Sequence, residues 1–109
     1  MEKGNLFAHI PPNFTNEILE TLLATKYLKL ERILSAGHAT ARGEWYNQNF
    51  DEWVILLKGS ACLFFDGETE PIELQPGDYL HIPAHAKHRV EWTDSEQKTV
   101  WLALHFTQD

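Results

Sequence analysis

The hydrophobic pattern changes its period once along the chain. Between residues 13 and 25, the apolar residues Ile18, Leu19, Leu22 and Leu23 recur at helical spacing, which predicts a short amphipathic helix. From residue 27 onward, short apolar runs alternate with turn residues such as those at 66–67 and 75–78. This second pattern is typical of six to eight antiparallel strands in a sandwich or jelly-roll arrangement. We therefore predict an all-β fold, an antiparallel jelly-roll β-barrel with a short N-terminal helix.

The length of the chain limits its domain organisation. A chain of 109 residues is long enough for one small hydrophobic core and too short for a second. No repeat, low-complexity segment or linker interrupts it. We divide it into an N-terminal segment that contains the helix, residues 1–26, and a β-barrel, residues 27–109.

One predicted strand, at residues 52–57, is apolar on both of its faces. If Glu52 and every second residue after it face the interior, Trp53, Ile55 and Leu57 face outward. Large apolar side chains on an outer face need a cover. A symmetric partner subunit is the simplest cover, so the sequence predicts a homodimer.

Charge and composition exclude several classes of protein. The formal net charge is −7 and the nine Lys and Arg residues are scattered, so no basic face is available for a nucleic-acid partner. No apolar run has the length of a membrane span, and the N-terminus lacks the basic-then-apolar form of a secretion signal. The single cysteine, Cys62, lies in an apolar run, where it reads as a small core residue. These features predict a cytoplasmic protein without a membrane partner.

The second half of the chain places a histidine on an apolar strand face. His88 shares its parity with Val90 and Trp92, while Arg89 and Glu91 have the opposite parity. Because side chains alternate along a strand, the imidazole is expected to point into the core. It is a candidate ligand or base, and the alternative is a core histidine satisfied by one backbone carbonyl.

The segment around His88 resembles the second motif of the cupin family. That motif reads glycine, five residues, Pro-x-Gly, two residues, histidine, three residues, asparagine, and Gly77, Pro83 and His88 occupy matching positions. Two positions depart from it, because His85 replaces the glycine and Trp92 replaces the asparagine.

The first cupin motif is matched only at its end. Glu52 and Gly59 have the spacing of its glutamate and final glycine. Its two histidines are missing: one register places Tyr46 and Gln48 there, and the other places Trp45 and Asn47. The chain thus resembles a small single-domain cupin with a degenerate first motif.

The resemblance implies a small-molecule partner in the barrel interior, and one reading adds a metal. In that reading Gln48, Glu52 and His88 hold one divalent transition metal (zinc, iron, nickel or manganese), and the protein is a dioxygenase- or isomerase-type enzyme of unknown substrate. In the other, the protein is a metal-free ligand-binding or regulatory dimer without catalysis. Tyr46, Gln48 and Trp92 are the candidate ligand-binding residues, because aromatic walls with polar tips suit such pockets. The residues to which the sequence assigns no role are His38, His81, His85 and His105.

Overall fold

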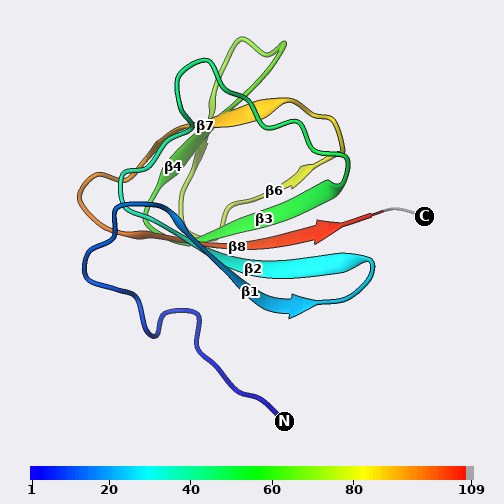
Figure 1. Cartoon of the computed structure of the whole chain (residues 1–109). Coiled ribbons are helices and arrows are strands. Elements are labelled where there is room, and N and C mark those ends of the chain that lie inside the picture. Colours follow the sequence, from blue (N-terminus) through cyan, green and yellow to red (C-terminus); the bar gives the residue numbers. More distant parts are fainter. Residues whose placement is uncertain (108–109) are drawn as a thin grey trace.

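The computed structural model describes residues 1–107, and these form antiparallel β-structure (Figure 1). Eight strands follow one another along the chain: β1 (Ile18–Ala24), β2 (Leu28–Ser35), β3 (Asp51–Lys58), β4 (Ala61–Phe65), β5 (Ile72–Leu74), β6 (Tyr79–Ile82), β7 (His88–Thr93) and β8 (Thr99–Phe106). The strands predicted from residue 27 onward are thereby confirmed. Among the described residues, no helix is long and apolar enough to cross a membrane.

The strands form two sheets that face each other as layers (Figure 1). The larger sheet has the order β1-β2-β8-β3-β6, and the smaller has the order β5-β4-β7. Strand alternation then divides each strand into an inward and an outward row. In the larger sheet Val54 pairs with Ala103 and Leu56 with Trp101, and all four are buried. These pairs form the core against Leu63 and Leu74 of the smaller sheet.

The predicted N-terminal helix is wrong, because residues 18–24 form strand β1 at the edge of the larger sheet. A register shift between Thr21 and Leu23 inserts an extra residue, Leu22, into the ladder with β2. Such a bulge interrupts the two-residue alternation. The pairs Ile18-Leu19 and Leu22-Leu23 therefore imitate helical spacing although the backbone is extended.

The predicted closed barrel is also not what the strands form. They divide into two antiparallel sheets, and residues 36–50 join the smaller sheet through an isolated bridge from Tyr46 to His88 and through hydrogen bonds between Thr40 and Val90. The all-β and antiparallel parts of the prediction are confirmed, while the described strands do not close into one continuous sheet.

Buried Arg32 holds the N-terminal segment against the outer face of the larger sheet. Its guanidinium donates hydrogen bonds to the carbonyl oxygens of Leu6 (3.0 Å) and Ala8 (2.6 Å) and pairs with Glu20 of the neighbouring strand β1. Such charge-assisted bonds are stronger than neutral ones. Residues 1–26 thus contribute a covering segment on the outer face of the larger sheet and its edge strand, β1.

Candidate functional site

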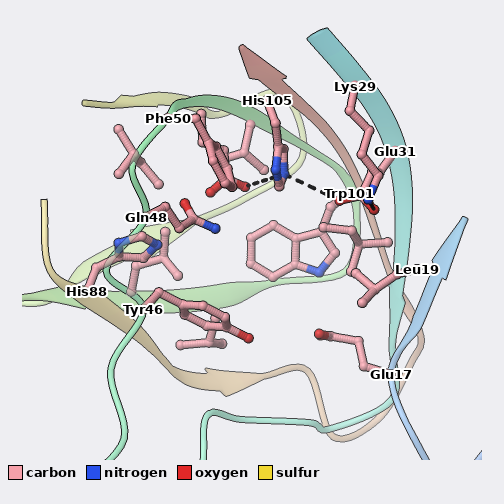
Figure 2. Close-up of a pocket in the computed structure, with 16 residues that line it drawn as sticks. Glu17, Leu19, Lys29, Glu31, Tyr46, Gln48, Phe50, His88, Trp101 and His105 are labelled. Carbon is pink, nitrogen blue, oxygen red and sulfur yellow. Dashed lines mark ion pairs between the residues drawn. The ribbon is translucent and has the colours of Figure 1, made fainter. Parts of the chain in front are cut away.

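A cavity of about 310 Å³ lies between the two sheets (Figure 2). Its volume is at the small end of the range of ligand pockets. The inward rows of both sheets and the segment before β3 supply its walls, which combine apolar and aromatic side chains with carboxylates and imidazoles. The lining residues that carry polar groups are Glu17, Lys29, Glu31, Tyr46, Gln48, Glu52, His88, Trp101 and His105.

Strand register brings Glu52, His105 and Glu31 together on the wall of the larger sheet. Glu52 pairs directly with His105 across β3 and β8, and Glu31 is on the inward row of the next strand, β2. The Nε2 atom of His105 lies 3.3 Å from Glu31 Oε1 and 3.6 Å from Glu52 Oε2 (Figure 2). This Nε2 atom is buried and makes no hydrogen bond to any described residue.

Burial shifts the protonation of Glu52 and His105. It raises the pKa of Glu52 to about 7, and the neighbouring Glu31 carboxylate adds to the increase. Burial also lowers the pKa of His105, against the opposing effect of Glu31. Both changes disfavour the charged forms. A carboxyl group that is half ionised near neutral pH both accepts and donates protons, so Glu52 has the property that acid–base chemistry requires.

His88 lies on the opposite wall, at the beginning of β7. Its Nδ1–H donates to the carbonyl oxygen of Ala86 at 2.7 Å, which leaves Nε2 as the acceptor nitrogen. The ring is stacked between Tyr46 and Phe65, with centroid distances of 5.6 and 5.3 Å. Burial lowers the pKa of His88, so the neutral imidazole is favoured.

Backbone pairing fixes Tyr46 beside His88. The amide of Tyr46 donates to the His88 carbonyl oxygen (2.7 Å), and the amide of His88 donates to the Tyr46 carbonyl oxygen (3.1 Å). The Tyr46 hydroxyl points across the cavity toward Glu17 (Figure 2). Burial, Glu17 and Glu52 raise the pKa of Tyr46, so its hydroxyl stays protonated and can donate a hydrogen bond.

The carboxylate of Glu17, at the cavity edge, is held in place by Ser35. The indole Nε1–H of Trp101 donates to Ser35 Oγ at 3.1 Å, and the Ser35 hydroxyl donates to Glu17 Oε2 at 2.6 Å. This chain orients Glu17 by residues that are themselves buried. Glu17 therefore has a defined position although it precedes the first strand.

Of the residues predicted from the sequence, Tyr46, Gln48, Glu52 and His88 line this cavity and Trp92 does not. Trp92 is 39% exposed. A register shift opposite Cys62 and Leu63 inserts Glu91 as an extra residue in β7. Beyond this bulge the alternation is reversed, so Trp92 no longer shares the inward face of His88 and Val90.

Two of the histidines without a predicted role, His38 and His81, have contacts outside the cavity. His38 accepts a hydrogen bond from the Ala36 amide (2.9 Å) and donates to the Thr15 carbonyl oxygen (2.7 Å), so it fastens a loop. His81 is on the outer face of the larger sheet, 2.8 Å from a carboxylate oxygen of Asp51.

His85 occupies the motif position that is glycine in the cupin pattern, and its backbone explains that glycine. Its φ angle is 65°, in the left-handed region that glycine adopts without steric cost. His85 thus adopts a backbone conformation that glycine adopts more easily.

A family model described as "Cupin domain" matches residues 34–105, well over half of the chain. The chain belongs to the cupin family. A protein from Ralstonia eutropha JMP134, provisionally named a mannose-6-phosphate isomerase, is 48% identical to this cupin. The alignment covers 99% of this chain and 100% of that one, with a TM-score of 0.96. A cupin superfamily protein from Desulfitobacterium hafniense DCB-2 shares the fold at 19% identity, with a TM-score of 0.78 over 99% of this chain and 94% of that one.

A more distant similarity links this cupin to enzymes of known name. The 3-hydroxyanthranilate 3,4-dioxygenase of Burkholderia lata is 32% identical over 54 residues, which are 48% of this chain and 31% of the enzyme. The Burkholderia cenocepacia enzyme of the same name is 30% identical over 61 residues, which are 54% of this chain and 34% of the enzyme. The aligned part is about a third of the length of these relatives.

The donor set of this cupin does not fit the metal centre that the family pattern implies. Glu52 and His88 are the two strong donors at the motif positions, and Tyr46 and Gln48 stand where the pattern has imidazoles. A neutral amide and a protonated phenol are weaker metal ligands than imidazole. Within residues 1–107, no three His, Cys, Asp or Glu side chains are grouped so that they could hold a metal ion.

Sequence reasoning missed the contributions of Glu17 and Glu31 and left His105 unassigned. Two signals were present in the sequence. Glu31 shares one face of a predicted strand with Lys29 and Ile33. His105 shares one face of another with Trp101 and Ala103. Neither signal specifies a face without the pairing of β2, β8 and β3. Glu17 lies before its strand and has no periodic signal.

Proposed function

We propose that this cupin binds a small organic molecule in the cavity, without a resident transition metal at the motif position. Tyr46, Gln48, Glu52 and His88 supply the polar contacts of this site. The observation that carries the proposal is the cavity itself, in which the acceptor nitrogen of His88 and the carboxyl group of Glu52 share one apolar and aromatic interior. A few polar groups within apolar walls are the usual composition of a ligand pocket.

The donor chemistry favours this proposal over a metalloenzyme of the dioxygenase or isomerase type. A transition-metal site requires three or more strong ligands, and Gln48 cannot replace an imidazole in charge or basicity. The similarity to 3-hydroxyanthranilate 3,4-dioxygenases covers only part of each enzyme. This partial similarity does not support the same activity for this cupin.

Metal uptake distinguishes the two functions. After purified protein is loaded with zinc, nickel or ferrous iron and dialysed, we expect negligible metal by elemental analysis in the native protein. The Gln48→His variant adds a third strong donor and is expected to retain more metal. Adding His88→Ala to that variant should remove the metal again, whereas adding His81→Ala should not, because His81 lies on the outer face.

The same samples test ligand binding. In a two-dimensional NMR fragment screen of the native protein, small molecules are expected to shift the resonances of cavity residues, and His88→Ala is expected to weaken these shifts. Stoichiometric metal in the native protein that His88→Ala removes would reject the metal-free site. A screen in which no fragment shifts any cavity resonance would reject ligand binding.

We also propose that the protein is a homodimer whose interface is the outer face of the larger sheet. Trp53 pairs with Leu104 and Ile55 with Leu102 across β3 and β8 on this face. Trp53 stacks on Tyr79 at a centroid distance of 5.4 Å, and Tyr79 is 63% exposed. An apolar row that ends in an exposed aromatic residue supports a partner surface.

A charge placed on this surface should separate the subunits. Sedimentation is expected to show a dimer at micromolar concentration for the native protein and a monomer for Tyr79→Arg, because an unpaired charge would be buried. Ile72→Arg is the matched control, since Ile72 is an exposed apolar residue of the smaller sheet, and it should remain dimeric. A native protein that sediments as a monomer would contradict the proposed interface.

A further inference from the structure

Acidic side chains outnumber basic ones around the cavity. Glu17, Glu31 and Glu52 all line it, while Lys29 is the one Lys or Arg among the described lining residues. The ammonium group of Lys29 lies 3.1 Å from Glu31 Oε2, and its side chain is about half exposed, at 49%. It therefore balances one carboxylate at the cavity edge, and the other lining residues among 1–107 include no further Lys or Arg.

Glu52, one of the two buried acids among these, lacks a hydrogen-bond partner among the described residues. Glu52 is only 9% exposed and makes no hydrogen bond to any of residues 1–107. His105 Nε2 lies 3.6 Å from Glu52 Oε2, beyond hydrogen-bond distance. A buried carboxyl group without a hydrogen-bond partner is energetically costly. A ligand that brings a donor or a positive charge to this point would remove that cost.

Aromatic side chains complete the surroundings of these acids. Tyr46, Phe50 and Trp101 line the same cavity, and Figure 2 shows the Trp101 ring between the Tyr46–His88 side and the Glu17–Glu31 side. The negative face of an aromatic ring attracts a cation, most strongly where water is excluded. Carboxylates and aromatic rings around one small space are the combination that binds organic ammonium groups.

We propose that the cavity selects a small organic cation, an ammonium compound with an apolar body, and this inference rests on the proposed binding function. The ammonium group lies against Glu31 and Glu52, and the apolar body packs against Trp101 and Tyr46. A phosphorylated sugar does not suit this cavity, because a phosphate group would face the three acids, and the one lysine among the described lining residues, Lys29, is already paired with Glu31. The provisional name of the Ralstonia eutropha relative therefore does not predict the ligand of this chain.

Three probes of similar shape and different charge test this proposal. Benzylamine is protonated at neutral pH, benzyl alcohol is neutral, and benzoate is an anion. Each is titrated into the ¹⁵N-labelled native protein, and binding is measured from the shifts of cavity resonances. We expect benzylamine to bind about tenfold more tightly than benzyl alcohol, as one favourable charge interaction predicts. Benzoate should cause no shifts at the same concentrations.

Charge variants show whether the cavity acids cause this preference. Glu31→Gln removes one carboxylate and leaves Lys29 without its partner, so benzylamine should bind about tenfold more weakly and benzyl alcohol should be unaffected. Glu73→Gln is the matched control, because Glu73 is an exposed acid of strand β5 and does not line the cavity. It makes the same change in net charge without touching the site.

The possible results distinguish a failure of cation selection from a failure of the proposed ligand binding. If benzyl alcohol or benzoate binds in the cavity as tightly as benzylamine, the binding function stands and the selection of cations is wrong. Equal weakening of benzylamine by Glu31→Gln and Glu73→Gln would also overturn it, because the effect would then be one of overall charge. If none of the three probes shifts a cavity resonance, the cation proposal is rejected, whatever the wider fragment screen finds.

Discussion

Replacing Glu52 with glutamine is expected to increase the free energy of unfolding at pH 8 and to leave it almost unchanged at pH 4.5. Burial, assisted by Glu31, raises the pKa of this carboxyl group from 4.5 to about 7 in the folded protein. The folded state then binds the proton more tightly than the unfolded state does. The stability that this proton gives is fully present below pH 4.5 and is lost as pH rises toward the folded pKa. By linkage the loss is on the order of 3 kcal/mol, and glutamine avoids it.

Urea denaturation of both proteins between pH 4.5 and 8 measures this effect. The two unfolding free energies should diverge as pH rises, with Glu52→Gln the more stable. Glu31→Gln removes one cause of the raised pKa and should reduce the pH dependence without abolishing it. The exposed residue Glu73 provides the control, because Glu73→Gln should leave the pH dependence unchanged. Parallel curves for the native protein and Glu52→Gln would show that the carboxyl group ionises in the folded state at no cost.

This destabilising carboxyl group is informative because it lies in the proposed binding site. A glutamine of nearly the same shape would suit a purely structural position better at neutral pH, since it has no charge to bury. Natural proteins keep such unfavourable groups mainly where function requires them. The expected gain in stability at pH 8 would therefore be accompanied by weaker binding of a cationic ligand. The two measurements together separate a structural role from a binding role.

Strand alternation predicted the parts of the site that lie on regular strands. Glu52 lies near the start of β3, where the next inward residues, Val54 and Leu56, are buried. His88 begins β7 and shares its inward face with Val90. Two residues far apart in the sequence were therefore assigned to one interior, and the structure places both in the cavity. Their roles in binding remain predictions.

Bulges account for the two clearest failures of sequence reasoning. One extra residue in β1, Leu22, made an extended segment look helical, and one extra residue in β7, Glu91, turned Trp92 away from the cavity. A bulge depends on which strand lies opposite and at which register. The charge of the cavity also escaped sequence reasoning, because Glu31 and His105 meet only when β2, β8 and β3 are paired.

Replacing Gly59 with alanine is expected to destabilise the protein by about 3 kcal/mol or more. Gly59, at the turn between β3 and β4, has a φ angle of 90°, and a side chain in this left-handed region costs about 1–2 kcal/mol. A Cβ atom there would collide with Thr99 Oγ1 and lie 2.8 Å from Thr99 Cα. Thr99 is fully buried, so neither atom can move away without disturbing β8.

Gly67 separates the cost of the backbone angle from the cost of this contact. Its φ angle is also 90°, and a Cβ atom there would meet nothing within 4 Å. Gly67→Ala should therefore lose only the conformational part, about 1–2 kcal/mol, and the larger loss in Gly59→Ala measures the clash with Thr99. Urea midpoints of the two variants provide the comparison, and if Gly59→Ala does not fold while Gly67→Ala does, the order is the same. Equal losses would mean that the final glycine of the first cupin motif is needed only for its turn. A larger loss at Gly59 would show that this glycine lets the β3–β4 turn approach β8 directly, the strand that carries His105 into the cavity.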